Sequence, residues 1–429
     1  TYMQNLAKKI KSNKAIISVI GLGYVGLPLC KTLLEKKFTV FGFEKNQSRI
    51  NDIENNKIKI DAVKNYNFTK KIKNKKFFLF KKFKKIKESD IIIICVPTPL
   101  KNNNPDLSDI VNVTKNILLN IKLNQLIILE SSTYPGTTKN LIVNKILKKN
   151  IKIGKNYFVG YSPEREDPGN KYYSLGEINK VVSGYTNNCK NLTKIFYKKF
   201  INKIHVAENI ETAEFSKLYE NTYRNVNIAL ANEAKVLAEK IDLNIFDIIK
   251  CCKTKPFGFQ AFYPGPGVGG HCIPIDPVYL SWLAKKNNFT TDIINLAVKI
   301  NNYMPVRIVG YIKKYLKKNK KNRVFILGAA YKKDINDLRQ SPIIKIINLF
   351  KKNKIKFIYN DNYIPILKSK KLNKNYKSQR VLKKNLKKFD TILLLTDHKY
   401  YDRNFIQKNS NMIFDTRNFF NKNLNLKIL

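Results

Sequence analysis

The residue of this sequence best suited to covalent chemistry is a cysteine at the end of a glycine-rich segment. Cys272 closes the run Gly265-Pro-Gly267-Val-Gly269-Gly270-His-Cys, which places four glycines within six positions. Glycine has no side chain, so a loop of this kind can bring its backbone close to a ligand. An acid, Asp276, follows the cysteine by four residues. An isolated cysteine is usually a buried thiol, but these neighbours favour a nucleophile.

Three other side chains could assist such a cysteine. Glu164 lies in the run Tyr-Ser-Pro-Glu-Arg-Glu-Asp-Pro-Gly, after a predicted strand, and is a candidate general base. The alternative for this run is a surface turn with a local ion pair. Lys217 and Asn221 are four residues apart in a predicted helix, so they share a face and could hold a developing oxyanion. The alternative for that pair is a solvated helix face.

A phosphate-binding pattern follows the first predicted strand, in Gly21-Leu-Gly23-Tyr24-Val25-Gly26. Its glycines permit a tight turn, close approach to a pyrophosphate, and close packing of helix on strand. The pyrophosphate then lies at the helix N-terminus, where free N–H groups favour anions. Glu44 ends the second predicted strand, about twenty residues on, where an acid can bind both ribose hydroxyls of NAD. Arg49 either lies over the adenine or is a solvated helix residue.

Two more segments end predicted strands, where open α/β sheets bind their ligands. One is Cys95-Val-Pro97-Thr98-Pro99, and the other contains Ser132 and Thr133 in Ser-Ser-Thr-Tyr-Pro-Gly-Thr. Taken alone, either could be an ordinary hydroxyl-rich turn. We interpret Cys95 as a small buried residue rather than a nucleophile.

These motifs require parallel strands to position them, and the chain alternates strand-like runs with amphipathic stretches as α/β proteins do. Ala207–Ile241 has no glycine or proline and predicts one long helix, suited to a connector or a dimer spine. After it, strand-like runs start again and indicate a second, smaller doubly wound domain. The predicted strands are Ala15–Ile20, Phe38–Phe43, Asp90–Val96, Leu126–Leu129, Tyr157–Tyr161, Val181–Ser183, Arg323–Leu327, Lys356–Tyr359, Thr391–Leu395 and Met412–Phe414.

The charge balance is extreme, with 81 basic and 31 acidic residues for a net charge of +50. A nucleic-acid-binding protein would concentrate its basic residues in one place. Here lysine and asparagine are spread along the whole chain, so we favour a drift in surface composition and expect no nucleic-acid partner. The six cysteines form no CxxC pair and there are only three histidines, which argues against zinc or any other metal. Scattered thiols, with no membrane-spanning or secretory segment, suit a cytoplasmic protein.

Taken together, the motifs resemble those of one family, the UDP-glucose/UDP-N-acetyl-mannosamine dehydrogenases. GLGYVGLP, CVPTPL, SSTYPGT, YSPEREDPGN, GPGVGGHCIPIDP and GAAYKKDINDLRQSP occur in the order that the family shows. The resemblance covers nearly the whole chain. The wording of YSPEREDPGN and GGHCIPIDP is most similar to bacterial UDP-N-acetylglucosamine 6-dehydrogenases of surface-polysaccharide synthesis.

The resemblance implies an α/β fold with two Rossmann-like, doubly wound domains joined by a long central helix. We expect an NAD-binding domain over residues 1–206, a central helical domain with the cysteine loop over residues 207–305, and a UDP-binding domain over residues 306–429. Members of the family usually form dimers or larger homo-oligomers.

The resemblance also implies the chemistry, in which a UDP-sugar is oxidised at C6 through a thioester on Cys272. Glu164 would assist the attack of water, Lys217 and Asn221 would stabilise oxyanions, and Asp276 would orient water or tune the lysine. The implied cofactor contacts are Gly21, Gly23, Tyr24, Val25, Gly26, Glu44, Arg49, Pro97, Thr98, Ser132, Thr133 and Arg339. The implied substrate contacts are Glu164, Arg165, Lys217, Asn221, Tyr263, Gly265, Gly267, Gly269, Tyr331, Lys332 and Arg417.

One departure from the family bears on the substrate. UDP-glucose enzymes carry an arginine upstream of the cysteine loop that reaches a neighbouring site, whereas Lys255–Gln260 has none. We therefore expect a UDP-N-acetylhexosamine, with UDP-N-acetylglucosamine first, as the substrate. UDP-glucose and UDP-N-acetylmannosamine stay as alternatives. Two other classes of protein are a nucleic-acid-binding protein and an inactive dinucleotide-binding regulator, and the intact set of site residues argues against both.

Glu44 predicts which nicotinamide cofactor the protein uses. A carboxylate at this position repels a 2′-phosphate, so kcat/KM should be clearly higher with NAD than with NADP. Steady-state kinetics with each cofactor measures the ratio, and comparable efficiency with NADP would contradict the assignment of Glu44.

Overall fold

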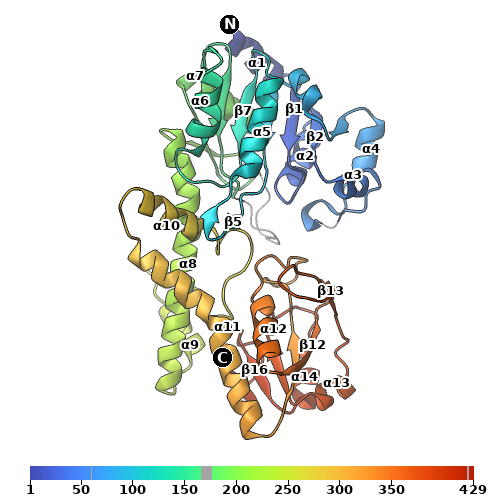
Figure 1. Ribbon diagram of the computed structural model, residues 1–429, viewed down its shortest axis with the longest axis vertical. Helices are drawn as coiled ribbons and strands as arrows, with labels where there is room; N and C mark the ends of the chain where they lie inside the picture. The colour runs from blue at the N-terminus through green and yellow to red at the C-terminus, as the bar shows by residue number, and fades with distance from the viewer. Residues whose placement is uncertain (59, 166–175, 423–424) are drawn as a thin grey trace. The chain divides into compact units, whose positions relative to one another are not determined.

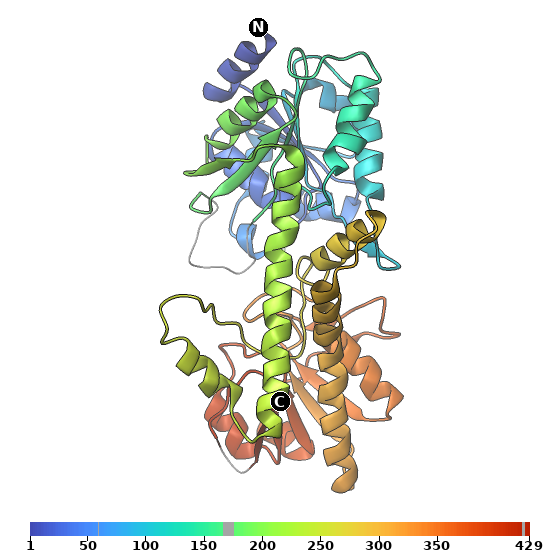
Figure 2. The ribbon, with the colours of Figure 1, turned by 90° about the vertical axis from the view of Figure 1, so that its left-hand side faces the viewer.

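The computed structural model describes residues 1–58, 60–165, 176–422 and 425–429. The chain divides into two compact units, Thr1–Glu220 and Asn221–Leu429. Helix α8 (Ile210–Lys240) crosses this division as one continuous helix, which Figure 2 shows along its length. In the described parts of the chain, no helix combines the length and the apolar character needed to span a bilayer.

A mostly parallel sheet forms the centre of the first unit (Figure 1). Among the residues described there, its eight strands lie in the order β10-β9-β8-β7-β4-β1-β2-β3. From β3 to β8 the strands run parallel in the 3-2-1-4-5-6 order of dinucleotide-binding sheets. β9 pairs antiparallel with β8. The strands are β1 (Ile16–Ile20), β2 (Thr39–Phe43), β3 (Phe77–Phe80), β4 (Ile91–Ile94), β7 (Leu126–Leu129), β8 (Phe158–Tyr161), β9 (Lys180–Gly184) and β10 (Ile204–Val206).

Helices cover both faces of this sheet, and β4 shows why. Its four isoleucines are all fully buried, and alternate residues enter two separate cores, as a strand covered on both faces requires. One core packs under α1, α2 and α7, and the other under α5, α6 and the start of α8. These helices are α1 (Tyr2–Lys11), α2 (Gly26–Glu35), α5 (Ser108–Leu119), α6 (Asn144–Leu147) and α7 (Asn187–Tyr197), with α3 (Gln47–Glu54) and α4 (Phe68–Lys73) between β2 and β3.

The second unit contains a smaller parallel sheet. Within its described residues the strand order is β12-β11-β15-β16-β17, a 2-1-3-4-5 arrangement that is also doubly wound. Its strands are β11 (Arg323–Leu327), β12 (Lys356–Asn360), β15 (Thr391–Leu394), β16 (Ile413–Asp415) and β17 (Leu426–Ile428). Its helices are α9 (Ile245–Cys252), α10 (Asp276–Lys286), α11 (Asp292–Lys318), α12 (Pro342–Lys352), α13 (Lys383–Lys388) and α14 (Arg403–Asn409).

The predicted fold class is confirmed, with two Rossmann-like sheets and a long helix between them in the chain. Each predicted strand is present within a few residues of its expected bounds, and the long helix covers 210–240 rather than 207–241. Three described strands of the two large sheets were not predicted, namely β3, β10 and β17. β3 is four residues long between lysine-rich segments, and the other two have three residues each, so none carries a readable alternation. The three-part division at 206 and 305 stays a prediction.

Helix α8 has an unusual distribution of side chains, because its buried face is polar. Glu214, Lys217, Asn221, Asn225 and Asn232 are all buried, and their spacings of three, seven, eleven and eighteen residues from Glu214 put them on one face. Large apolar side chains of the same helix are exposed instead. They are Phe215, Tyr219, Tyr223, Leu230 and Leu237. Several of these buried polar side chains contact loops, as Glu214 does at Gly136 and Asn225 does at Ile273.

The glycine-rich segment before Cys272 packs against loops that follow strands of the sheet in the second unit. A Cβ placed on Gly269 would overlap the Cβ of Tyr331, which lies in the loop after β11. Gly270 has φ +85° and donates its backbone N–H to the carbonyl oxygen of Arg339 at 2.8 Å. A Cβ on Gly265 would lie 2.7 Å from Nη1 of Arg417. The backbone reaches these neighbours because the positions are glycine.

Replacing Gly269 by alanine should therefore destabilise the protein, by about 1–3 kcal/mol, because Tyr331 or the loop must move. Gly310 is a matched control, since it lies in the interior of α11 with nothing within 4 Å of an added Cβ. Gly310→Ala should be neutral or stabilising by about 0.5–1 kcal/mol. Denaturant unfolding measures both, and equal stability of the two variants would refute the close approach at Gly269.

Candidate functional site

The first group of candidate residues forms the loop between β1 and α2. Gly21 has φ +92°, and a Cβ there would lie 2.9 Å from the carbonyl oxygen of Cys95. A Cβ on Gly26 would overlap the carbonyl oxygen of Gly21. Tyr24 and Val25 complete the turn, and α2 starts at Gly26 with its N-terminus directed at the loop. The loop thus has the cradle that a pyrophosphate needs, with backbone N–H groups at a helix start.

Glu44 and Arg49 both contact this loop. Glu44 accepts a hydrogen bond from the backbone N–H of Leu22 at 3.2 Å and another from Asn46 at 2.9 Å. Arg49 donates through Nη1 to the carbonyl oxygen of Leu22 at 3.3 Å. A carboxylate oxygen has two acceptor positions, so Glu44 can brace the loop and still bind a ribose hydroxyl. The position of Arg49 over the adenine stays a prediction.

The two hydroxyl-bearing segments meet beyond the neighbouring strands β4 and β7. Thr98 donates its hydroxyl to the carbonyl oxygen of Ser132 at 2.7 Å, and Thr133 donates to the hydroxyl of Thr137 at 2.6 Å. Pro97 precedes Thr98 in the first segment. The structure therefore brings these predicted cofactor residues together at the sheet edge that also carries the glycine loop. Burial raises the pKa of the Cys95 thiol and nearby Glu130 raises it further, which fits its interpretation as a structural residue.

Helix α8 holds the second of these segments through a buried carboxylate. Glu214 accepts hydrogen bonds from the backbone N–H groups of Gly136 at 2.6 Å and Thr138 at 2.8 Å, and from the Thr138 hydroxyl at 2.6 Å. Burial raises the pKa of Glu214 to about 7, against the lowering effect of these donors. Sequence reasoning missed Glu214, although an acid on the buried face of a predicted helix is a signal that could have found it.

Glu164 lies just after β8, and its two carboxylate oxygens have different partners. Oε1 accepts from the backbone N–H of Arg165 at 2.7 Å, and Oε2 contacts the ammonium of Lys180 at 2.7 Å. The Arg165 side chain makes a two-point contact with Glu220, with Nη2 at 2.5 Å and Nε at 3.2 Å, and donates to the carbonyl oxygen of Asn179 at 2.8 Å. The role of Arg165 in binding substrate stays a prediction. The rest of the motif, residues 166–169, lies outside the described residues.

Lys217 and Asn221 lie on the polar, buried face of α8. Both are largely shielded from solvent, so they do not form the solvated helix face that was the alternative reading. Asn221 donates through Nδ2 to Oδ2 of Asp276 at 2.5 Å. One predicted pair of site residues is thereby in direct contact.

Cys272 immediately precedes the turn that leads into α10. Its carbonyl oxygen accepts hydrogen bonds from the backbone N–H groups of Ile275 at 3.0 Å and Asp276 at 2.9 Å, and its side chain is partly buried. Asn225 also fixes this turn, because its Nδ2 donates to the carbonyl oxygen of Ile273 at 3.0 Å.

A chain of buried asparagines fixes the other end of the cysteine loop. Asn301 of α11 donates to the carbonyl oxygen of Asn225, and Asn232 donates to Oδ1 of Asn301, both at 2.9 Å. Oδ1 of Asn232 in turn accepts from the backbone N–H of Gly265 at 2.9 Å. Sequence reasoning missed these asparagines, since a composition rich in asparagine hides the few that are buried.

Further predicted residues lie in the same loop or in segments that follow strands of the second sheet. Arg417 donates through Nε to the carbonyl oxygen of Leu395 at 2.8 Å, and burial lowers its pKa against the raising effect of Asp397 and Asp415. Arg339 forms a two-point ion pair with Asp337, with its Nη2 at 2.6 Å. Lys332 follows Tyr331 after β11, Gly267 has φ +121°, and the Tyr263 ring stacks on Phe246 with centroids 6.4 Å apart.

Family models match the chain in three consecutive segments. The NAD binding domain of the UDP-glucose/GDP-mannose dehydrogenase family matches residues 15–201, its central domain matches residues 211–303, and its UDP binding domain matches residues 325–422. The first segment contains the glycine loop and Glu164, the second contains α8 and Cys272, and the third contains the second sheet.

Individual relatives match over most of the chain. It is 34% identical to protein CapL of Staphylococcus aureus, over 94% of this chain and 96% of that protein. It is 33% identical to UDP-N-acetyl-D-glucosamine 6-dehydrogenase of Pseudomonas aeruginosa, over 77% of this chain and 79% of that enzyme. The structure of a UDP-D-ManNAc dehydrogenase from Pyrococcus horikoshii superposes with a TM-score of 0.85 at 29% identity, covering 95% of this chain and 96% of that one.

These matches agree with the glycine loop, the cofactor-type sheet and the cysteine loop described above, and they confirm NAD as the cofactor. The chain belongs to the UDP-glucose/GDP-mannose dehydrogenase family, as an NAD-dependent oxidoreductase of the UDP-sugar 6-dehydrogenase type.

Proposed function

We propose that this protein oxidises the C6 alcohol of a UDP-N-acetylhexosamine to a carboxylate through a thioester on Cys272. UDP-N-acetylglucosamine is the first candidate substrate, and a uronate product would serve surface-polysaccharide synthesis. The observation that carries the proposal is the fixed cysteine loop, in which Cys272 precedes a helix and Asp276 contacts Asn221 at 2.5 Å. The names of the relatives from Pseudomonas aeruginosa and Pyrococcus horikoshii support an N-acetylhexosamine.

NAD, when bound, supplies a hydride acceptor for each of the two oxidations. The glycine loop fits its pyrophosphate, since Gly21 and Gly26 lie too close to neighbouring backbone to carry a Cβ, and this keeps the turn tight at the start of α2. Glu44 braces this loop and is the candidate partner of the ribose. In this proposal Gly23, Thr98 and Ser132 complete the cofactor side.

Cys272 acts between the two oxidations. Its thiolate adds to the C6 aldehyde to give a thiohemiacetal, and loss of a second hydride leaves a thioester. Water then adds to the thioester carbon, the C–S bond breaks, and Cys272 leaves as thiolate. The net change is RCH2OH + 2 NAD⁺ + H2O → RCOO⁻ + 2 NADH + 3 H⁺, so electrons and atoms balance.

The other candidate residues handle protons and negative charge in these steps. Glu164 receives the proton of the attacking water as general base. Lys217 and Asn221 stabilise the oxyanions, and their burial makes such contacts stronger than they would be in water. Asp276 orients Asn221 through their hydrogen bond, and Tyr331, Lys332, Arg339 and Arg417 contribute to binding the nucleotide sugar.

UDP-N-acetylmannosamine is the second candidate substrate, because the related structure from Pyrococcus horikoshii carries that name and superposes over nearly the whole chain. The two sugars differ only in the configuration at C2, away from the reacting carbon. The same chemistry at C6 applies to both.

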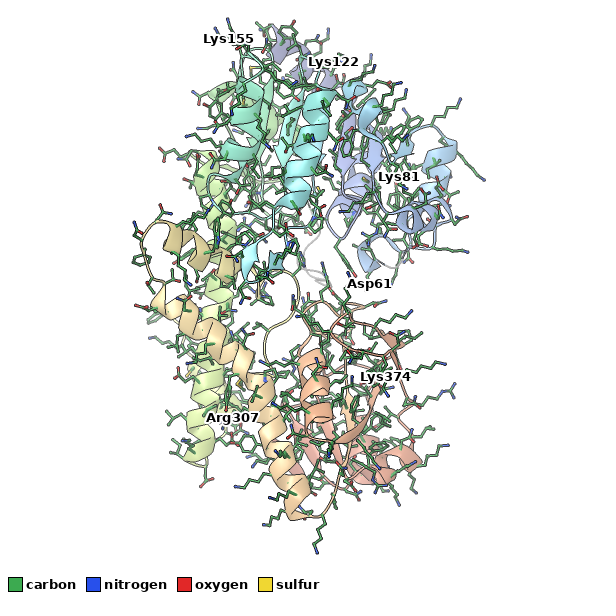
Figure 3. The ribbon with its side chains drawn as sticks, viewed as in Figure 1. Asp61, Lys81, Lys122, Lys155, Arg307 and Lys374 are labelled. Atoms are coloured by element: carbon green, nitrogen blue, oxygen red, sulfur yellow. The ribbon has the colours of Figure 1, made fainter. Side chains whose placement is uncertain are left out.

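We further propose that the protein is a homo-oligomer, at least a dimer, and binds no nucleic acid. The exposed apolar face of α8, with Leu230 and Leu237 each 61% exposed, gives a surface suited to a second copy of the chain, and light scattering decides the stoichiometry. Lysines project from separate elements in each unit, as Lys81, Lys122, Lys155 and Lys374 illustrate in Figure 3. This spread supports a compositional drift over a nucleic-acid surface.

A panel of UDP-sugars should identify the substrate by the amount of NADH released. UDP-N-acetylglucosamine should give about two NADH per sugar, as the covalent route requires, and Cys272→Ala should abolish uronate formation. Cys251→Ala is the matched control, because Cys251 is an exposed cysteine in α9, and it should keep the wild-type rate. A single NADH with a free aldehyde as product would refute the thioester route.

A further inference from the structure

A buried ion cluster adjoins Glu164 in the first unit. Lys180, the first residue of β9, is 4% exposed. Its Nζ lies 2.7 Å from Oε2 of Glu164 and 3.3 Å from Oε1 of Glu130. Glu130 directly follows β7, is fully buried, and also accepts a hydrogen bond from the Tyr197 hydroxyl. One ammonium therefore contacts two carboxylates away from solvent.

The antiparallel register of β8 and β9 explains why these residues meet. Tyr161 is paired with Ser183. If this register is continued, Glu164, three residues after Tyr161, lies opposite Lys180, three residues before Ser183. The contact is therefore built into the only antiparallel pairing that the described residues of this sheet contain.

The charges in the cluster depend on one another. Burial by itself would lower the pKa of Lys180, but Glu130 and Glu164 raise it, so the ammonium stays charged. Burial raises the pKa of Glu130, Lys180 lowers it, and Glu164 raises it again. Two buried carboxylates that share a region disfavour each other's ionised form. Without the lysine, one of the two carboxylates would take up a proton, because protonation removes the repulsion between them.

The backbone around Glu164 is held at the same time. Oε1 of Glu164 accepts from the N–H of Arg165, whose side chain binds Glu220 of α8 and the carbonyl oxygen of Asn179. Asn179 directly precedes Lys180, so the two sides of the loop are joined at adjacent residues.

We propose that Lys180 is a positioning residue for thioester hydrolysis, which holds the Glu164 carboxylate ionised and in place while Glu130 holds the lysine. This role rests on the proposed function, in which Glu164 accepts a proton from the water that attacks the thioester carbon. The lysine itself does not touch the reacting atoms. Replacing Lys180 should slow thioester hydrolysis. The rates of the two hydride transfers should not change, because those steps use no base at Glu164.

The experiment is stopped-flow detection of NADH with the substrate found in the UDP-sugar panel. Lys180→Met should release about two NADH per site in a fast first phase at close to the wild-type rate, and then turn over at least about tenfold more slowly. Lys180→Arg should keep most of the wild-type turnover, since it preserves the charge. Lys180→Met with Glu130→Gln should turn over faster than Lys180→Met, because removing the second carboxylate removes the repulsion.

Lys235→Met is the matched control. Lys235 is equally buried and pairs with Glu239 at 3.4 Å in the second unit. Its variant therefore removes a buried ammonium elsewhere, and its NADH trace should not show the pattern of a fast first phase and then slow turnover. Equal loss of both phases in Lys180→Met, or turnover like wild type, overturns the proposal. If Lys180→Met does not fold, the test uses Lys180→Arg and the double variant Lys180→Met/Glu130→Gln. The proposal is then overturned if the turnover of the double variant does not recover toward that of Lys180→Arg.

The outcomes separate this proposal from the one on which it rests. A wild-type protein that releases no NADH with any UDP-sugar overturns the proposed function. A fast phase followed by slow turnover in Glu164→Gln, without the same pattern in Lys180→Met, overturns the role of Lys180 alone.

Discussion

The polar face of α8 is the constraint on which the candidate site depends. At successive turns, Glu214 binds the loop at Gly136 and Thr138, Asn221 binds Asp276, and Asn225 binds the turn after Cys272. A helix fixes the spacing of its side chains, so within the second unit Asn221 and Asn225 hold the start of α10 and the turn after Cys272 in a set register. Within the first unit, Glu214 holds the loop at Gly136. A buried polar group without a partner is costly, and this cost makes each of these contacts specific.

The distribution of acids follows from the same physics. Glu130, Glu214, Asp276 and Asp361 are all almost fully buried, and each has hydrogen-bond donors in contact, as Asp361 has at Ala329, Ala330 and His398. The chain has 81 basic residues and 31 acidic ones, and these four buried acids each take part in a loop contact or an ion pair. The large positive charge is mainly a property of the surface, and the site within it is still built from balanced charges.

The features that could be predicted from the sequence are those formed by residues contiguous in the chain. The glycine loop, the isoleucine strand β4 and the cysteine loop could be predicted because turn geometry, burial and close backbone approach each leave a local pattern. The contact of Glu164 with Lys180 could not, since it depends on the register of two antiparallel strands. The same holds for Asn232 and Gly265, which lie in different elements, and for β3, whose four residues carry no period.

The central claim is that Cys272 carries the sugar as a thioester that Glu164 helps water to release. Intact-protein mass spectrometry of the Glu164→Gln variant, mixed with NAD and substrate, tests it most directly. We expect a covalent adduct with the mass of the UDP-uronosyl group, which peptide mapping assigns to Cys272. If no adduct forms, and Cys272→Ala still produces uronate at close to the wild-type rate, the cysteine is only a packed residue of its loop and the account is wrong.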